Sequence, residues 1–249
     1  MSGRCLLDTK MVFSQSEFDI RCEWGEHAVA HLAPISDVVV IVDVLSFSTC
    51  VEIATQRDAV IFPYRWKDET AETFAVSVGA ELADNKRNDS RYSLSPISLT
   101  DIPKGTRLVL PSPNGATLTL GTGPTPTLTG CLRNARAVAL AAQKYGKRIA
   151  IIPAGERWPD RSLRPAFEDW IGAGAIISQL HGALSPEAQA AGAAFHQAGS
   201  GIELLIRQCG SGKELIARGF EENVSLASAI NVSECVPVLV NGAYMRAGL

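Results

Sequence analysis

Asp37-Val38-Val39-Val40-Ile41-Val42-Asp43 is the stretch that decides the fold class of this chain. Its five consecutive β-branched apolar residues predict a strand that is buried on both faces, because a half-exposed strand would alternate apolar with polar residues. The strand ends at Asp43, and the hydroxyl residues Ser46, Ser48 and Thr49 follow where a helix can begin. Open α/β sheets present their chemistry at such carboxyl ends of strands. We therefore predict an α/β protein whose function centres on Asp43.

The composition is that of an ordinary globular protein. Of the 249 residues, 46% are apolar and 20% are charged, and we expect residues 1–249 to form a single α/β domain, either as one body or as two lobes that meet at the site. The net charge of −3 gives no reason to expect a nucleic acid or an anionic membrane as a partner. The six cysteines are scattered without paired spacing, which argues against a disulfide framework or a structural zinc site. No apolar run reaches the length of a signal-peptide core or a transmembrane helix, so we expect a cytoplasmic protein.

Two later segments repeat the pattern of a buried strand followed by a polar turn. Residues 106–110 predict a strand that leads into a turn at Asn114-Gly115, and residues 147–152 predict a strand that leads into Gly155-Glu156. If these strands and the first are parallel neighbours, their carboxyl ends converge on one crevice. Asn114 is then placed to cap the following helix, whose free N–H groups face the same edge as Asp43.

The segments between these strands are assigned from turn and helix signals. Residues 79–105 are interpreted as a polar surface excursion and residues 121–130 as a Gly/Thr/Pro connection, while residues 236–240 are interpreted as a closing edge strand. The sequence at 210–214, Gly-Ser-Gly-Lys-Glu, resembles the end of a phosphate-binding loop only superficially, because Glu214 stands where serine or threonine is required. We interpret it as the N-terminus of a helix.

The predicted crevice gathers carboxylates, hydroxyls and helix N-termini. Glu168 and Asp169 begin the helix after the third strand, close to Asp43. Oxygen-rich sites of this kind suit Mg²⁺ and a phosphorylated substrate. Each feature also has a simpler interpretation: Asp43 as a helix cap, Asn114-Gly115 as a turn, and the two later acids as partners of the helix dipole. As a cluster, Arg157, Arg161 and Arg164 could recruit an acidic substrate.

Six motifs occur in a characteristic order between residues 37 and 240. They are Val42-Asp43-Val44-Leu45 with its hydroxyl tail, Asn114-Gly115, Asn134-Ala135, Ala154-Gly155, Glu168-Asp169 with Ala173-Gly174, and the closing stretch from Gly219-Phe220-Glu221-Glu222-Asn223 to Val236-Pro237-Val238. Together they resemble the 2-phosphosulfolactate phosphatase (ComB-like) family. The resemblance implies a layered α/β/α fold with a largely parallel or mixed sheet, and a homo-oligomer, which we expect to be a homodimer. It also implies Mg²⁺-dependent hydrolysis of a phosphate ester on a small acidic hydroxy acid, 2-phosphosulfolactate in coenzyme M biosynthesis.

The chain departs from that family just after Asp43. The family often has Arg-Ala-Thr after the Val-Leu pair, whereas this chain has Ser46-Phe47-Ser48. An arginine there could hold an acidic group of the substrate with two hydrogen bonds, and a serine cannot. The resemblance therefore supports the reaction class better than it supports the natural substrate.

We accordingly predict a phosphoric monoester hydrolase. Asp43, Glu168 and Asp169 are the predicted catalytic and metal-binding residues, as ligands, base or nucleophile. The predicted phosphate-binding residues are Ser46, Ser48, Thr49, Asn114, Gly115 and Gly155. Two alternatives remain at this point: a haloacid-dehalogenase-like phosphatase with Asp43 as nucleophile, which would want a second aspartate where Leu45 stands, and a non-catalytic protein that binds phosphorylated metabolites.

Overall fold

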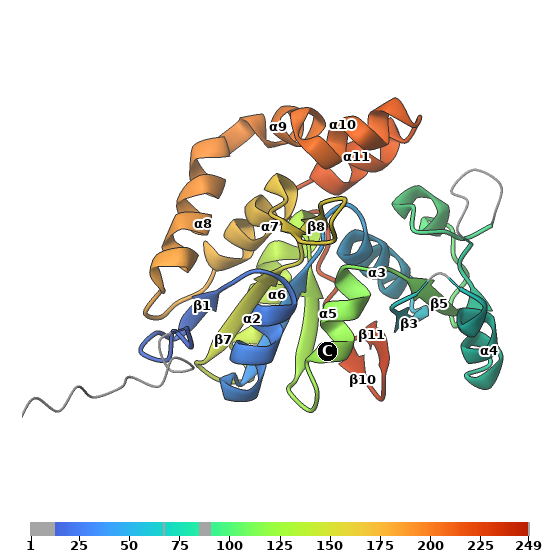
Figure 1. Ribbon diagram of the computed structural model, residues 1–249, viewed down its shortest axis with the longest axis horizontal. Helices are drawn as coiled ribbons and strands as arrows, with labels where there is room; N and C mark the ends of the chain where they lie inside the picture. Colours follow the sequence, from blue (N-terminus) through green and yellow to red (C-terminus); the bar gives the residue numbers. More distant parts are fainter. Residues whose placement is uncertain (1–12, 67, 85–90, 249) are drawn as a thin grey trace, which may run out of the picture.

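The computed structural model describes residues 13–66, 68–84 and 91–248 and has an α/β fold in which helices cover both faces of one large mixed sheet (Figure 1). Within these residues the sheet has nine strands in the order β1-β7-β2-β6-β10-β11-β3-β5-β4. A separate two-stranded ribbon, β8-β9, follows β7. The predicted layered α/β/α fold with a mixed sheet is confirmed.

The opening stretch forms β2 (Val38–Val42), as predicted, and all five of its residues are buried. β2 lies between two parallel neighbours, β7 (Ile149–Pro153) and β6 (Thr127–Gly130). Because helices cover both faces at this point, every side chain of β2 meets apolar atoms, which explains its unbroken run of β-branched residues. The end of β2 and the end of β7 therefore lie side by side.

The expectation that three parallel neighbours converge is wrong for β5 (Arg107–Pro111). The pairings of β6 with β10 (Pro237–Val240), of β10 with β11 (Ala243–Arg246) and of β11 with β3 (Val60–Tyr64) are all antiparallel. These three reversals make β3 and its parallel neighbour β5 run opposite to β2 in the sheet. The turn after β5 nevertheless reaches Asp43, through the helix that follows it.

Two other sequence interpretations are corrected by the same sheet. Residues 127–130 form β6, a central strand, and not part of the connection expected over residues 121–130. The threonines favoured a connection because hydroxyl side chains are uncommon in a buried strand. They are tolerated here because Thr129 Oγ1 donates to Ile41 O at 2.9 Å. The stretch 236–240 contributes β10, which lies in the middle of the sheet and not at its edge, because the unpredicted strand β11 pairs with it.

Of the expected surface excursion, residues 85–90 lie outside the described residues. Its second part packs into the protein, because Leu99 and Ile102 are buried beside the helix that follows β2. Leu94 faces the candidate site. Residues 91–105 are therefore packed against the core, and Leu94 forms part of the lining of the site.

Helices form a layer on each face of the sheet. One face, with Val39 and Ile41 of β2, packs against α2, α3 and α5, and the other, with Val38, Val40 and Val42, packs against α6, α7 and α8. Figure 1 shows α9, α10 and α11 as an arch above the end of the sheet at which β8 lies.

The bounds of the helices are α2 (Gly25–Leu32), α3 (Phe47–Gln56), α4 (Glu69–Ser77), α5 (Gly115–Gly121), α6 (Ala135–Ala142), α7 (Phe167–Ile177), α8 (Pro186–Ala198), α9 (Ile202–Gln208), α10 (Gly210–Ala217) and α11 (Glu221–Ser228). The remaining strands are β1 (Ile20–Cys22), β4 (Glu81–Leu82), β8 (Glu156–Arg157) and β9 (Leu163–Arg164). Short 3-10 helices lie at Ala33–Ile35, Pro96–Leu99, Leu132–Asn134 and Gly199–Gly201.

The helix α7 carries the two predicted acids and is held tightly between β2 and α8. A Cβ atom added at Gly172 would lie 2.7 Å from Val44 Cγ2, and one added at Gly174 would lie 2.1 Å from Ala191 O of α8. Neither distance is compatible with a side chain. The small residues of this helix thus set how closely it approaches its neighbours, and with it the position of Glu168 and Asp169. None of the helices in the described residues is long and apolar enough to cross a membrane.

Replacing Gly174 by alanine should therefore destabilise the protein by about 1–3 kcal/mol, since the new methyl group overpacks a backbone contact. Urea unfolding measures the change. Gly192→Ala on α8 is the matched control, because its Cβ would meet its nearest neighbour, Ile177 Cγ2, only at 3.8 Å. The control should be neutral or slightly stabilising, because alanine favours a helix more than glycine does. Equal stabilities of the two variants would contradict this account of α7.

Candidate active site

A cavity of about 160 Å³ lies at the carboxyl ends of β2 and β7, and residues of α10 also line it. Figure 1 shows α10 above this end of the sheet. Its walls come from the loop after β2, the turn after β5, the ribbon β8 and one face of α10. The lining residues are Asp43, Leu45, Ser46, Leu94, Ser112, Pro113, Asn114, Glu156, Ser211, Glu214, Leu215 and Arg218. The cavity therefore joins segments that are far apart in the sequence around Asp43.

Asp43 is buried, and both of its carboxylate oxygens accept hydrogen bonds from the backbone. Oδ1 accepts from Phe47 N at 3.1 Å, at the start of α3, and Oδ2 accepts from Gly115 N at 2.8 Å, at the start of α5. The carboxylate thus does cap a helix, as the simpler interpretation held, and it also lines the cavity. Two helix N-termini point at one negative charge, which is a favourable arrangement for the charged form.

Gly115 is required for this contact. A Cβ atom added there would lie 2.4 Å from Phe47 Cδ1 and 2.8 Å from Asp43 Oδ2. Asn114 occupies the N-cap position of α5 but does not cap it with its side chain, which corrects the sequence interpretation. Its Nδ2 instead donates to Glu156 Oε2 at 3.0 Å, across the cavity.

Asp169 holds the backbone of the two neighbouring strand ends. Its Oδ1 accepts from Val44 N at 2.7 Å and its Oδ2 accepts from Gly155 N at 2.9 Å. Burial, and then the charges of Asp43 and Glu168, raise the pKa of Asp169 well above its usual range. Gly155 has a φ of +69°, which favours glycine, and the space for a Cβ is filled by Arg164 O. The charge of Asp43 thus acts on Asp169, but Asp169 is not among the residues that line the cavity.

Glu168 faces α10 and lies behind the cavity wall. Its Oε2 accepts from Cys209 Sγ at 3.2 Å, and Cys209 in turn caps α10 by accepting from Gly212 N at 3.4 Å. The sequence at 210–214 begins this helix, as predicted. Glu168 is thereby connected to the helix that closes the cavity.

The three predicted hydroxyl groups are placed differently. Ser48 Oγ accepts from Asp43 N at 2.9 Å, and Thr49 Oγ1 donates to Val44 O at 2.8 Å, so both brace the loop from inside. Ser46 lines the cavity, and the peptide bond before it, from Leu45, is cis. Its Oγ is buried without a hydrogen-bond partner among the described residues. Buried hydroxyl groups are normally satisfied, which makes Ser46 Oγ a candidate partner for a polar group of a ligand.

Glu156 is a site residue that the sequence prediction left out. It lines the cavity together with Asp43, and burial, then the charge of Asp43, raise its pKa to about 7. Its position directly after Gly155, at the end of a buried strand, was the available signal. Of the arginine cluster, Arg157 pairs with Glu26 at the surface, whereas Arg164 donates to Ser211 Oγ at 3.3 Å beside the cavity.

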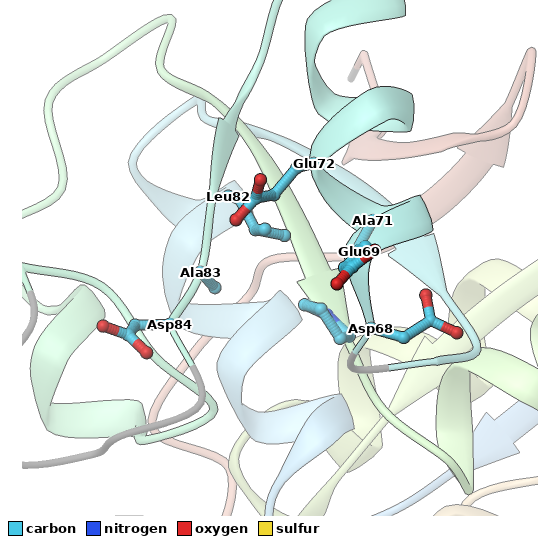
Figure 2. A pocket seen from close by; sticks show the side chains of 8 residues that line it. Asp68, Glu69, Ala71, Glu72, Leu82, Ala83 and Asp84 are labelled. Atoms are coloured by element: carbon cyan, nitrogen blue, oxygen red, sulfur yellow. The ribbon is translucent and has the colours of Figure 1, made fainter.

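A larger hollow of about 540 Å³ lies elsewhere, between α4 and β4. Figure 2 shows its acidic lining: Glu69 and Glu72 project from α4, and Asp84 follows the strand opposite. Asp68 adds a further carboxylate there. The charged residues in the described lining of this hollow are all acidic, and Asp68 already caps the N-terminus of α4 by accepting from Thr70 N. Such a lining repels a phosphorylated acid, so the smaller cavity is the better candidate.

The cavity offers oxygen atoms that suit a hard cation. Asp43 and Glu156 both line it, and burial, followed by the charge of Asp43, raises the pKa of Glu156 to about 7. Across the part of the chain that the structure describes, no three His, Cys, Asp or Glu side chains are grouped as metal ligands. A cation in this cavity would therefore be held by these two carboxylates and completed by phosphate oxygens and water, an environment that suits Mg²⁺.

Residues 27–242 match the family model described as 2-phosphosulpholactate phosphatase. The chain belongs to this family. It is also 29% identical, over 211 residues, to the 2-phosphosulfolactate phosphatase of Methanothermobacter thermautotrophicus, in a match that covers 83% of this chain and 88% of the relative. The motif-based resemblance is therefore confirmed, and membership of the 2-phosphosulpholactate phosphatase family makes the chain a phosphoric monoester hydrolase.

The raised pKa of Glu156 leads to a prediction about stability and pH. The folded protein keeps a proton on this carboxyl up to about pH 7, whereas the unfolded chain loses it near the ordinary value of 4.5. The stability that this proton contributes is complete below about pH 4.5 and is lost as the pH rises to about 7. Glutamine has no carboxyl proton to lose, so Glu156→Gln should not lose this stability as the pH rises. The free energy of unfolding of the variant should therefore increase, relative to that of the unsubstituted protein, from about pH 4.5 to about pH 7.

Urea unfolding at a series of pH values, without divalent metal, measures this difference. Glu222→Gln on α11 serves as the control, because Glu222 is exposed and remote from the cavity. Its profile should run parallel to that of the unsubstituted protein. A parallel profile for Glu156→Gln as well would show that Glu156 is not the group that couples folding to pH here.

Proposed function

We propose that this protein is a Mg²⁺-dependent phosphatase that hydrolyses the phosphate ester of a small acidic hydroxy acid. A 2-phosphosulfolactate-like ester, which gives sulfolactate and phosphate, is the substrate that the family description and the relative support. The observation that carries the proposal is the small cavity in which Asp43, Glu156 and the unpartnered hydroxyl of Ser46 meet.

The chain's own residues would bind and orient the phosphate. Ser46 Oγ has a free donor inside the cavity, and Asn114 fixes the Glu156 carboxylate by its hydrogen bond. Asp43 accepts hydrogen bonds from two backbone N–H groups, so its carboxylate keeps a fixed orientation. Rigid placement of this kind lowers the barrier because little reorganisation is needed when the reaction occurs.

Asp43 and Glu156 are the residues that would hold the metal ion. A bound Mg²⁺ would supply charge neutralisation for the phosphate oxygens and for the bond that breaks. Asp169 and Glu168, which the sequence placed among the ligands, would support this pair from behind: Asp169 through the backbone of Val44 and Gly155, and Glu168 through α10. The homodimer and the cytoplasmic location expected from the sequence stay predictions.

Asp43→Asn should lower phosphate release by more than about a hundredfold, because residues that only support a metal ligand already contribute about 10- to 100-fold. The asparagine keeps the shape of the side chain but removes the charge and sets an amide N–H₂ group against a backbone N–H. Phosphate released from 2-phosphosulfolactate in the presence of Mg²⁺ is the measurement. Asp101→Asn, at an exposed aspartate outside the cavity, is the matched control. Undiminished turnover by Asp43→Asn would sink the assignment.

Metal binding has its own readout, independent of turnover. After treatment with EDTA, added Mg²⁺ should raise the thermal midpoint of the protein, because a ligand that binds only the folded state stabilises it. The rise should be absent or much smaller in Asp43→Asn. A protein that binds phosphorylated acids without Mg²⁺ and releases no phosphate would instead be the non-catalytic binder considered above.

A further inference from the structure

The cavity has a cationic side chain on the wall formed by α10. Three acids line the cavity, Asp43, Glu156 and Glu214, and among the described residues Arg218 is the one basic side chain in the lining. The phosphate-binding groups lie on the other walls, at the ends of β2 and β5 and on β8. Figure 1 shows α10 above these strand ends. A small substrate that placed its phosphate at the strand ends would extend the rest of its structure toward α10, because α10 supplies the remaining wall.

Arg218 is held in place weakly and keeps free donors. Its Nη1 donates to Glu214 Oε1 at 3.0 Å, one helical turn away, and its guanidinium lies 5.7 Å from the centre of the Phe220 ring. The two side chains of the ion pair are 55% and 65% exposed. Exposed ion pairs contribute little to stability, so an anion from the substrate can compete with Glu214 for the guanidinium. No described residue accepts a hydrogen bond from Nε or Nη2.

Such a guanidinium suits a planar or tripodal oxyanion. Its paired N–H groups match a carboxylate or a sulfonate through two parallel hydrogen bonds, which a lysine or a neutral group cannot reproduce. The phosphate does not need this residue, because the oxygen-binding groups and the two carboxylates that would hold the metal ion are on the opposite walls. The remaining role for Arg218 is recognition of a second negative group.

We infer that Arg218 is a specificity residue that binds the acidic group, carboxylate or sulfonate, that the substrate carries beside its phosphate ester. Glu214 competes for the same guanidinium and weakens binding of that group. This inference rests on the proposed phosphatase function and assigns the substrate class to a residue of this chain, since an ester without a second acid lacks the contact.

Two esters that differ only in the acidic group test the inference. 2-Phospholactate carries a carboxylate, and isopropyl phosphate carries a methyl group in its place. The preference is the ratio of kcat/KM for 2-phospholactate to that for isopropyl phosphate, measured by phosphate release with Mg²⁺. Arg218→Gln should lower this preference about ten- to hundredfold, mainly through KM, because it removes a charge-assisted hydrogen-bonded pair. Arg218→Lys should fall in between, and Glu214→Gln should lower KM for 2-phospholactate.

Arg136→Gln is the matched control. Arg136 also pairs with an acid at the surface, Glu234, and its side chain is 55% exposed, like that of Arg218. It lies outside the cavity lining, so the preference should not change. If Arg218→Gln leaves the preference within twofold of the unsubstituted value, or lowers both esters alike, the inference is overturned.

Failure of the proposed function would look different. An unsubstituted protein that releases phosphate from neither ester, nor from 2-phosphosulfolactate, would contradict the phosphatase assignment. Calorimetric binding of 2-phospholactate then decides the role of Arg218 separately: weaker binding by Arg218→Gln but not by Arg136→Gln supports the inference, and equal binding by both overturns it.

Discussion

The structure depends on buried carboxylates that bind backbone N–H groups from two segments at once. Asp43 joins the start of α3 to the start of α5, and Asp169 joins the loop after β2 to the loop after β7. Hydrogen bonds to a charged group are stronger than neutral ones, and these are shielded from water. They hold together loops that no strand pairing connects. Gly115 in particular lets the α5 backbone approach, because any side chain there would collide with Phe47 and Asp43.

The same arrangement concentrates negative charge at one end of the sheet. Burial, and then the charges of Asp43 and Glu168, raise the pKa values of Glu156 and Asp169, so the folded protein holds these groups at a cost in free energy. The packing of the rest of the core offsets this cost in free energy. The fully buried apolar strand β2 and the close contact of α7 with α8 are two examples of that packing. In the proposed phosphatase, a bound cation and the donors of the cavity would offset the repulsion between these carboxylates, so the same residues would serve both stability and function.

The arch of helices α9 to α11 gives the site its fourth wall. Cys209 begins α10 and donates to Glu168 on α7, so the helix that carries Ser211, Glu214 and Arg218 is fastened to the same acidic segment that lies behind the cavity. In the proposed function, the side of the cavity that would bind phosphate and the side that would face the remainder of the substrate come from different parts of the chain. Substitutions on α10 would then alter substrate preference without disturbing the groups that surround the phosphate.

The sequence by itself determined the elements whose residues carry a local signal. A run of five β-branched residues can be satisfied only by a strand covered on both faces, and the acid at its end, together with the family motifs, located the site at Asp43. Local signals could not reveal β6, where buried threonines are satisfied by contacts with β2, nor the central place of β10, which depends on its pairing with β11. The sequence also placed Asn114-Gly115 at the same edge as Asp43, and the Gly115 N–H does donate to Asp43, although β5 runs opposite to β2. Only the tertiary structure brings Glu156 and Arg218 together with Asp43 in one cavity, because packing joins segments that are far apart in the chain. It also decides which hydroxyl has no partner among the described residues, Ser46 and not Ser48 or Thr49, through the way in which the loop folds.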